Sequence, residues 1–596
     1  MKFTKYFMPF AALALLASCS NDNLDNPKEN GIQEETNNVD AAYVAFNIAM
    51  PSLGTKAGET YNDGYTGEAD VNDVWLYLYR ASKEQNLNGE TTYDKETTEA
   101  DAELYICKKV YFENKSDAEA NHDGSSVAVD AVTSTINAIF QLENVTEDDK
   151  NNFDYYAFIV VNKPDGIAEG NEGDEFSVIQ ADIQTASSHA VAQVSGDTGE
   201  EKVTFSTTPS NGMLKVDGTK VYFTMTNAPL VDEEKTAVTY LAKLDTGAFA
   251  VSPAQASSAA ATVVVQRGVA KVEMDIAANN ANDIVIDDEG NKYNTTAKVQ
   301  ITNWILDVVN ANGYTVQKVP TIDAFQTDGA WSGTHFLSSA IAHNVVTDDN
   351  KAMYHIYWSM DPEYDDDALT AAGPDQGDYL TLVEEGDRFN NLTDVEYCLE
   401  NTMDYNKMQK NQSTRIVFKG VVKLDGTTAE DFIYYPGSDI AYGVEGKVNS
   451  SSTSDQKLPG AKYKLSALLS GTTEEKDVIR KAIKAVDLEE EVYYYPGGVT
   501  YYTTIIRHFT DSQAGGDIYG EIDSLDKYVP ANLGRYGVVR NNWYKASISK
   551  VFGFGKPEIP DPTPDPDDDP DPIKYNIQLN INVLAWTMRT NGYILK

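Results

Sequence analysis

Near its C-terminus the chain carries a strand-like segment on a long arm that cannot fold by itself. From Tyr575 to Val583, apolar residues occupy every second position and alternate with Asn and Gln. A period of two is typical of a β-strand with one buried face. The segment follows residues 556–572, KPEIPDPTPDPDDDPDP, here called the Pro/Asp arm, whose composition favours an extended polyproline conformation. At about 3.1 Å per residue the arm spans roughly 50 Å, so the strand can reach a neighbouring molecule.

A second segment of the same design lies near the N-terminus. Val44, Phe46, Ile48 and Met50 alternate with small or polar residues, and Pro51 ends the run. Because both segments read as amphipathic strands, we interpret them as competitors for one groove. The first strand fills the groove before assembly, and the C-terminal strand of another molecule fills it afterwards.

In this interpretation the C-terminal strand is a donor whose inward side chains are Ile577, Leu579, Ile581 and Val583. From Leu584 onward the apolar positions continue on the other face, which predicts either a β-bulge between Val583 and Leu584 or a switch between two neighbouring strands. The alternative is an ordinary final strand that pairs within its own domain. The long arm argues against that alternative, because compact domains rarely use long structureless connections.

The first residues indicate export. Lys2 and Lys5 precede an apolar stretch that is too short to span a bilayer and that ends in Leu16-Ala17-Ser18-Cys19. Small residues before a cysteine resemble a bacterial lipobox, in which Cys19 carries lipid and becomes the mature N-terminus. The alternative is an ordinary signal peptide with an unrelated cysteine. Residues 20–40 are rich in Asn, Asp and Glu and predict a disordered spacer.

The charge of the chain excludes several classes of partner. Among its 596 residues, 92 are acidic and 47 are basic, which gives a formal charge of −45. Nucleic acid binding needs a basic face, and docking on an anionic bilayer needs one as well. The composition therefore predicts a well-hydrated exported protein without a nucleic acid partner.

We find no pattern typical of an enzyme or a cofactor site. The chain lacks H-E-x-x-H, G-x-S-x-G and G-x-x-x-x-G-K, and its six histidines are scattered. The acidic cluster from Asp361 to Asp367 lacks the spacing of an EF-hand, so a solvated loop is favoured over a calcium site. Cys107 and Cys398 lie in strand-like runs and predict small buried side chains without a disulfide. The sequence thus predicts a structural protein with no catalytic residue, metal or cofactor.

Most of the chain reads as short strands between turns rich in Asn, Asp, Gly and Thr, a pattern typical of β-sandwiches. Its length exceeds what one hydrophobic core usually serves, so two domains are expected. One amphipathic helix stands out. Thr472 and Glu475 have the spacing of a capping box. The apolar residues that follow at helical spacing are Val478, Ile479, Ala482, Ile483 and Val486.

Several segments, taken in order, resemble the fimbrillin family of type V pili, specifically the group of the minor fimbrium's structural subunit. They are the lipobox, the strand Tyr43–Met50 with Thr55-Lys56-Ala57 after it, RGVAKVEMDI at 267–276, EYCLENTMD at 396–404, VVRNNWYKASISKVFGFG at 538–555, the Pro/Asp arm, and NINVLAW at 580–586. The resemblance extends over nearly the whole chain. Its specific part is the order of the segments, because each segment alone is a generic strand.

The resemblance implies a mainly β fold of two transthyretin-like, Greek-key β-sandwich domains in tandem with few short helices. It also implies a lipoprotein precursor at the outer membrane, activated by a trypsin-like protease that removes the first strand. The matching position holds Lys56, and the chain has no Arg between Cys19 and Arg80. A protease that accepts lysine is therefore expected to cut between Lys56 and Ala57.

The predicted function is that of a stalk subunit of a cell-surface pilus, polymerised by strand exchange and serving adhesion, auto-aggregation and biofilm formation. Its expected partners are copies of itself, anchor and tip pilins, the protease and surface receptors. The alternative is a monomeric surface lipoprotein that binds glycans through its β-sandwiches. The predicted parts are a signal peptide (1–19), a spacer with the removed strand (20–56), two sandwich domains (57–311 and 312–555), the arm (556–572) and the donor strand (573–596).

Overall fold

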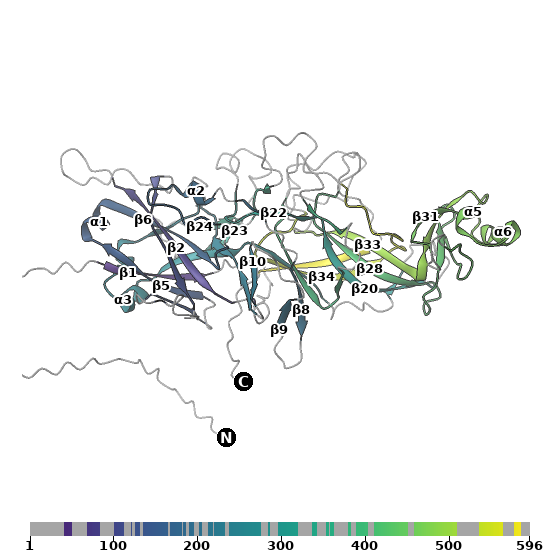
Figure 1. Ribbon diagram of the computed structural model, residues 1–596, viewed down its shortest axis with the longest axis horizontal. Coiled ribbons are helices and arrows are strands. Elements are labelled where there is room, and N and C mark those ends of the chain that lie inside the picture. The colour runs from purple at the N-terminus through teal and green to yellow at the C-terminus, as the bar shows by residue number, and fades with distance from the viewer. Residues whose placement is uncertain are drawn as a thin grey trace, which may run out of the picture. The chain divides into compact units, whose positions relative to one another are not determined.

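The computed structural model describes the chain between residues 41 and 585. It leaves out residues 50–67, 69, 84–100, 113–120, 122–124, 131–134, 165–166, 181–182, 186–189, 196–201, 206–212, 218–219, 233–237, 276–283, 287–295, 320–336, 342–352, 357, 363–378, 383–388, 403–410, 451–457, 509–535 and 564–576. The described chain is mainly β, with few short helices (Figure 1). The predicted fold class is therefore confirmed.

The first large sheet has ten strands and follows the order β3-β2-β6-β12-β17-β1-β5-β4, with β15 beside β6 and β16 beside β1. Its strands are β1 (Ala41–Ala49), β2 (Asp73–Ser82), β3 (Glu103–Tyr111), β4 (Ser126–Asp130), β5 (Thr135–Val145), β6 (Phe153–Val161), β12 (Met225–Asn227), β15 (Ala242–Leu244), β16 (Phe249–Ala250) and β17 (Ala261–Arg267). Alternate residues of β1, β2, β5, β6 and β17 belong to one hydrophobic core. The sheet therefore curves over its own buried face.

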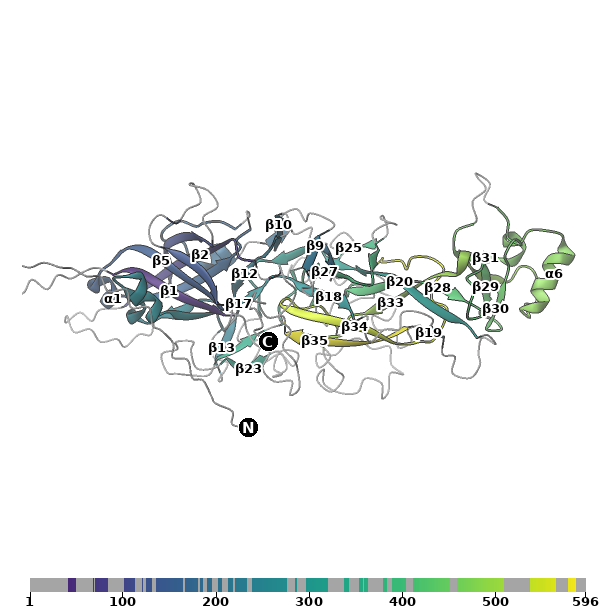
Figure 2. The ribbon, with the colours of Figure 1, turned by 90° about the horizontal axis from the view of Figure 1, so that it is seen from below.

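A second core lies between two further sheets. The six-stranded sheet has the order β35-β34-β18-β27-β8-β9, and the five-stranded sheet has the order β19-β20-β28-β33, with β26 beside β20. The strands are β8 (Ala190–Ser195), β9 (Lys202–Phe205), β18 (Ala270–Met274), β19 (Ile284–Val285), β20 (Lys298–Asp307), β26 (Asn390–Asn391), β27 (Asp394–Cys398), β28 (Arg415–Lys423), β33 (Val499–Ile505), β34 (Asn542–Val551) and β35 (Ile577–Ala585). Both sheets contribute large side chains to the core, such as Tyr544 from β34 and Trp304 from β20. This face-to-face packing is that of a β-sandwich. Figure 2 shows β34 and β35 in yellow, side by side.

Smaller elements complete the chain. The strands are β7 (Ile183–Thr185), β10 (Leu214–Asp217), β11 (Lys220–Phe223), β13 (Leu230–Asp232), β14 (Val238–Thr239), β21 (Val309–Asn310), β22 (Asn312–Tyr314), β23 (Leu337–Ile341), β24 (Met353–Ile356) and β25 (Tyr379–Leu380). The helices outside the insertion described below are α1 (Glu147–Asn152), α2 (Phe176–Gln180), α3 (Pro253–Ser258) and the 3-10 turn η2 (Thr246–Ala248), while the 3-10 turn η7 (Pro496–Gly498) ends that insertion. In the part of the chain described here, no helix is long and apolar enough to cross a membrane.

The chain passes from the first core to the second within one short step. Val269 belongs to the first core and Ala270 to the second, and only Gly268 and Val269 separate β17 from β18. Gly268 permits the close packing at this step, because an added Cβ would lie 2.6 Å from the sulfur of Met213. The predicted domain boundary at residues 311 and 312 stays a prediction.

Both described cysteines, Cys107 in β3 and Cys398 in β27, are free thiols. Cys398 is fully buried, as predicted, whereas Cys107 is half-buried. Burial raises the pKa of the Cys107 thiol to about 12, and the negative charge of Glu169 acts in the same direction. Burial also raises the pKa of Cys398 well above its ordinary value. Neither thiol is suited to act as a nucleophile at neutral pH.

The predicted helix forms part of an insertion between β28 and β33. Four strands, β30 (Ile440–Gly443), β29 (Phe432–Tyr435), β32 (Glu491–Tyr495) and β31 (Ala461–Lys464), form a sheet next to α5 (Leu465–Leu468) and α6 (Thr473–Ala482). The capping box is present, since the Thr472 hydroxyl accepts from Glu475 N and the Glu475 carboxylate accepts from Thr472 N. Helix and sheet share one core.

The buried face of α6 is narrower than the sequence predicted. Ile479 and Ile483 are buried, but Val478 is 62% exposed and Val486 is 78% exposed. The helix ends at Ala482, so Val486 lies past its last turn. Val478 lies about 100° around the helix from Ile479, outside the face that packs on the sheet.

These two neighbours give a matched test of the insertion. Truncation of a buried aliphatic side chain removes apolar contact and leaves a cavity, so Ile479→Ala should cost about 2–5 kcal/mol of unfolding free energy. Val478→Ala at the exposed position should cost less than about 0.5 kcal/mol. Urea unfolding, monitored through hydrogen exchange of the α6 amides, measures the loss of unfolding free energy in both variants. Equal losses of unfolding free energy in the two variants would show that α6 does not pack on the sheet through Ile479.

Candidate functional site

The candidate site is the place that β1 occupies within the first sheet. β1 pairs antiparallel with β5, with Val44 opposite Phe140 and Ile48 opposite Ile136. Along its other edge β1 pairs parallel with β17 at Phe46–Ala49 and antiparallel with β16 at its start. Because both edges carry ladder hydrogen bonds, removal of β1 would open a gap between β5 and β17. We call this gap the slot.

The side chains of β1 fill the slot completely. Val44, Phe46 and Ile48 each have 0% exposure and belong to the first core. The rings of Phe46 and Phe140 meet edge to face at 5.9 Å between centroids. The predicted alternation is therefore confirmed for these three residues, while Met50 lies outside the described residues.

The opposite face of β1 is covered in part, which the sequence did not predict. Ala45 is 2% exposed, and α3 packs against both β1 and β5. Tyr43, Asn47 and Ala49 on the same face are half-buried. A strand that replaces β1 must therefore carry large apolar side chains on one face, whereas the other face accepts polar ones except near the position of Ala45.

The free energy that holds β1 in place is large for a single strand. Burial of a large apolar side chain contributes roughly 1.5–3 kcal/mol, so Val44, Phe46 and Ile48 together contribute roughly 5–9 kcal/mol. Each ladder hydrogen bond adds about 1 kcal/mol net. The slot is thus a deep site for an extended strand.

The C-terminal strand β35 lies at the edge of the six-stranded sheet, where it pairs antiparallel with β34 of the same chain from Val551–Ile577 to Asn542–Ala585. Ile577 is 1% exposed, and Leu579 and Ile581 are half-buried against the second core. These three residues face one side of the sheet, as the alternation predicted. The structure places β35 in the position of the alternative that the sequence left open, an internal final strand. Its use between molecules stays a prediction.

The irregularity in this ladder is not where the sequence placed it. The register shifts between Ile548 and Lys550 of β34, opposite Leu579 and Gln578. Val583 and Leu584 keep a regular register with Tyr544 and Trp543. The prediction of a bulge between Val583 and Leu584 is therefore wrong, because β34 and not β35 supplies the extra residue.

Three of the predicted processing residues, Cys19, Lys56 and Ala57, lie outside the described residues. Glu68, eleven positions after Ala57, is described and is 1% exposed. It forms an ion pair of 2.8 Å with Lys271 of β18 and accepts a hydrogen bond of 2.5 Å from the Tyr397 hydroxyl. The Lys271 ammonium lies 3.5 Å from the centre of the Trp543 ring. Burial lowers the pKa of Lys271, and the Glu68 carboxylate opposes this shift.

This buried pair was not predicted, because a single Glu between turn-like residues carries no sequence signal. It attaches the segment that precedes β2 to β18 and β27, independently of β1. The segment that would follow a cut after Lys56 is therefore held in place at Glu68 even without the first strand.

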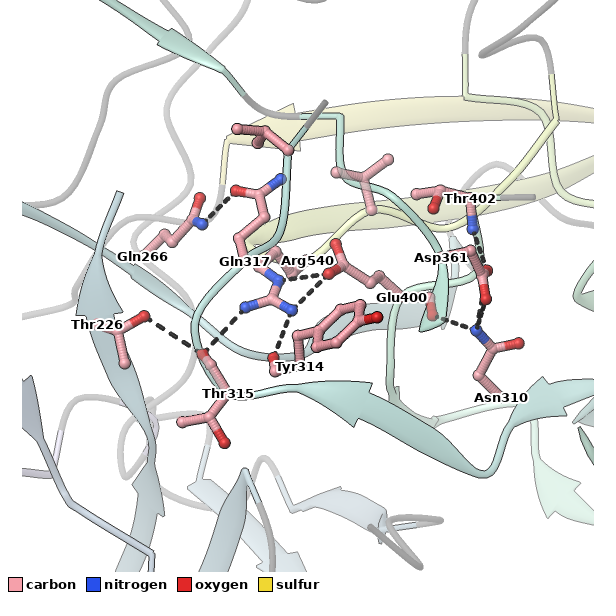
Figure 3. A network of polar contacts seen from close by, with 12 residues as sticks. Thr226, Gln266, Asn310, Tyr314, Thr315, Gln317, Asp361, Glu400, Thr402 and Arg540 are labelled. Carbon is pink, nitrogen blue, oxygen red and sulfur yellow. Dashed lines mark hydrogen bonds and ion pairs between the residues drawn. The ribbon is translucent and has the colours of Figure 1, made fainter. Parts of the chain in front are cut away.

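A second buried network joins the sheets around the start of β34 (Figure 3). Arg540 forms an ion pair with Glu400, with Nε 2.7 Å from Oε1, and donates to the carbonyl oxygens of Tyr314 and Thr315 at 2.7 and 3.3 Å. The Thr226 hydroxyl of β12 donates to the same Thr315 oxygen at 3.3 Å. The network thus connects a strand of the first sheet with the residue that precedes β34.

The same network corrects the sequence interpretation of the acidic cluster. Asp361 is buried, and its carboxylate accepts from the Asn310 amide at 2.9 and 3.0 Å and from Thr402 N at 2.8 Å (Figure 3). Asp361 is therefore a structural residue and does not belong to a solvated loop. Glu363, Asp365, Asp366 and Asp367 lie outside the described residues.

The described part of the chain holds no group of three or more His, Cys, Asp or Glu side chains arranged to bind a metal ion. His355 and His508 are buried, and each contacts a polar neighbour, Gln266 Oε1 at 2.8 Å and the Tyr544 hydroxyl at 2.7 Å. Burial lowers the pKa of His355 to about 3, so this ring is neutral at physiological pH. These two histidines are structural. The other four, His122, His189, His335 and His343, lie outside the described residues.

Residues 493–592, which contain β33, β34 and β35, match the family described as major fimbrial subunit protein type IV, fimbrillin, C-terminal. No curated protein matches the chain. Among solved structures, a candidate cell adhesion protein from Parabacteroides distasonis is 12% identical with a TM-score of 0.35, and the alignment covers 93% of this chain and 100% of that one.

Two further solved structures are similar to the same extent. A candidate cell adhesion protein from Bacteroides eggerthii is 10% identical with a TM-score of 0.32, over 93% of this chain and 98% of that one. Another from Parabacteroides distasonis is 11% identical with a TM-score of 0.33, over 92% of this chain and 100% of that one.

The buried pair of Glu68 and Lys271 can be tested by substitution. Glu68→Gln leaves the Lys271 ammonium buried without its counter-charge, so the free energy of unfolding should fall by about 3–5 kcal/mol. The double variant Glu68→Gln/Lys271→Met removes both charges and should recover most of this loss. Urea unfolding measures the three proteins. If the Glu68→Gln protein is as stable as the parent, Glu68 does not pair with Lys271 in the folded chain.

Proposed function

We propose that the protein is a structural stalk subunit of a cell-surface pilus, because residues 493–592 match the C-terminal fimbrillin family model. The observation that supports this proposal best is the slot, a deep strand-binding site whose occupant β1 belongs to the same chain. In this proposal the precursor is an outer-membrane lipoprotein that carries lipid on Cys19, and the subunit has no active site. It polymerises with copies of itself, with anchor and tip pilins at the ends, and serves adhesion, auto-aggregation and biofilm formation.

Proteolysis between Lys56 and Ala57 would be the activating step. In the uncut chain, β1 is tethered to β2 and binds the slot at a high effective concentration. After the cut, β1 is a separate peptide that only side-chain contacts and ladder hydrogen bonds hold in the slot. Once it dissociates, dilution prevents it from binding again. The new N-terminal segment would remain attached through Glu68 and Lys271, which lie 2.8 Å apart. The cut would therefore release β1 from the slot while the segment that contains Glu68 stays attached to β18.

The strand that refills the slot would be β35 of a neighbouring subunit. β35 has the same two-residue spacing of large apolar side chains as β1, at Ile577, Leu579 and Ile581. In its own chain β35 is an edge strand with one ladder, to β34. In the slot it would form ladders with both β5 and β17 and bury its apolar face fully. A strand gains free energy by such a move, because a second ladder and a deeper apolar site replace an edge position.

A second candidate function has one observation in its favour. Since β35 pairs with β34 of the same chain, β35 needs no second molecule to form its ladder. The protein would then be a monomeric outer-membrane lipoprotein that binds glycans through its β-sandwiches. N-terminal sequencing of protein extracted from the cell surface separates the two candidates: Ala57 as the first residue indicates the pilus subunit, and a lipid-blocked Cys19 indicates the monomeric lipoprotein.

The cleavage step predicts the behaviour of a single variant. Lys56→Ala should leave the exported protein unprocessed and unable to polymerise, because β1 stays tethered in the slot. Lys28→Ala is the matched control, since a cut after Lys28 would leave β1 attached to the chain. Electron microscopy and denaturing gels of surface extracts measure both. Normal fibres from the Lys56→Ala protein would contradict the assigned cut.

The donor role of β35 predicts a contrast between adjacent positions. Leu579→Asp places a charge on the apolar face and should abolish SDS-resistant polymers, because the first core cannot accept an unpaired carboxylate. Asn580→Asp, at the neighbouring position of the alternation, should reduce polymer yield no more than about twofold. Trypsin-processed protein analysed on unheated SDS gels gives the measurement. Polymers of normal length from the Leu579→Asp protein would rule out β35 as the donor.

A further inference from the structure

The Pro/Asp arm begins as part of the folded body, although its composition predicts a fully extended tether. Residues 556–563 are described, and Pro557 and Pro562 are buried. Ile559 is half-buried and packs on a small cluster formed by Ile305, Leu382 and Val417. Residues 556–563 of the arm therefore pack against the five-stranded sheet.

The arm is attached through its carbonyl oxygens. Arg415 Nη2 donates to the carbonyl oxygens of Pro560 and Asp561 at 3.1 and 3.2 Å. The Asn411 amide donates to the carbonyl oxygens of Asp561 and Thr563 at 3.3 and 2.7 Å. Because prolines 560 and 562 have no N–H, a Pro-rich chain offers few donors and cannot form a β-ladder. Arg and the Asn amide supply the donors that such a chain needs.

The Arg415 side chain is oriented by a buried carboxylate. Its Nε and Nη2 atoms lie 2.8 and 2.7 Å from Asp307 Oδ2, and Asp307 Oδ1 accepts from Val308 N and Leu382 N at 3.0 and 2.9 Å. Arg415 Nη1 donates to Asn411 Oδ1 at 2.7 Å, which orients the Asn411 amide nitrogen toward the arm. We call Asp307, Arg415 and Asn411 the arm clamp.

The start of the arm is fixed as well. Lys556 and Tyr501 exchange two backbone hydrogen bonds of 2.8 Å. Gly460 lies so close to the arm that an added Cβ would meet the Pro557 carbonyl oxygen at 2.1 Å. At the far end, Asp561 Oδ1 accepts from the backbone and hydroxyl of Thr563 at 2.9 and 2.7 Å, which closes a turn. The arm is therefore held at several points between Lys556 and Thr563.

We propose that the arm clamp holds Thr563 to its own subunit both before and after strand exchange, so that only the chain beyond Thr563 changes its path. This inference rests on the proposed function. It identifies Asp307, Arg415 and Asn411 as positioning residues for the donor strand. Arg415 and Asn411 contact the backbone carbonyls of the arm, and Asp307 orients Arg415; these contacts involve neither β35 nor the slot.

The clamp limits how far the donor strand can reach. Thirteen residues, 564–576, separate Thr563 from β35, and at about 3.1 Å per residue they span roughly 40 Å. If the arm were released back to Gly555, the 21 residues 556–576 would span roughly 65 Å. A shorter linker restricts the positions of the next subunit. It also raises the effective concentration of β35 at the slot of that subunit, provided that the linker length matches the distance from Thr563 to the slot. The clamp should therefore make the subunit spacing of the polymer uniform.

The test begins with the attachment itself, in the full-length chain. Glutamyl endopeptidase should cleave after Glu558 slowly, because the flanking residues are docked. Asn411→Gly combined with Ile559→Ala should increase this rate at least tenfold. Gly suits position 411, where φ is +65°, so the body should keep its conformation.

A second variant tests the other half of the clamp. Asp307→Asn/Arg415→Gln leaves no unpaired buried charge and should also increase the rate of cleavage after Glu558. Arg480→Gln, which removes a surface guanidinium paired with Asp477, is the control and should leave the rate unchanged. Equal rates in all proteins, measured by mass spectrometry, would overturn the clamp.

The role in exchange is tested on polymers of the processed protein. Electron microscopy should show a broader distribution of subunit spacing for Asn411→Gly/Ile559→Ala than for the parent and the Arg480→Gln control. An unchanged distribution, together with faster cleavage after Glu558, would overturn the positioning role while leaving strand exchange intact. A parent protein that forms no polymers would overturn the proposed function and, with it, the role of the clamp in exchange.

Discussion

The pairing of β1 along both of its edges is the interaction on which the first half of the fold depends. β5 and β17 do not contact each other through a ladder, and the continuous sheet from β3 to β4 exists only while a strand lies between them. Without an occupant, two rows of backbone donors and acceptors and the Phe140 ring would face water. A site of this kind selects for an extended segment with alternating apolar side chains. The same chain supplies one such segment at β1 and a second at β35.

Buried polar contacts keep the remaining fold in place around the slot. Arg267 N donates to Asn541 Oδ1, and Asn541 N donates to Val269 O, so the step from β17 to β18 is fixed to the start of β34. Two ion pairs are formed by residues next to this contact: Lys271 of β18 pairs with Glu68, and Arg540, which precedes Asn541, pairs with Glu400. Buried ion pairs contribute little net stability, because desolvation offsets their attraction. They do fix which elements meet, since an unpaired buried charge is far more costly than a paired one.

Local patterns in the sequence predicted local structure well. The alternation at Val44, Phe46 and Ile48 identified β1 and its buried face, and the capping box at Thr472 and Glu475 located the start of α6. The exposure of Val478 and the burial of Asp361 were not predicted. In both cases the outcome depends on the neighbouring element, because α6 covers only part of the sheet beside it and Asn310 and Thr402 surround the Asp361 carboxylate.

The sequence alone determined the mainly β character, the two amphipathic strands and the inability of a Pro-rich arm to form a ladder, because each follows from neighbouring residues. The tertiary structure decided which edge holds β35 in the single chain, where the arm is attached and how the buried charges are paired. These features join residues that are far apart in the chain: 329 positions separate Glu68 from Tyr397, and 145 separate Arg415 from Pro560. Periodicity reports on the faces of one element, whereas a contact between distant residues exists only after the whole chain has folded.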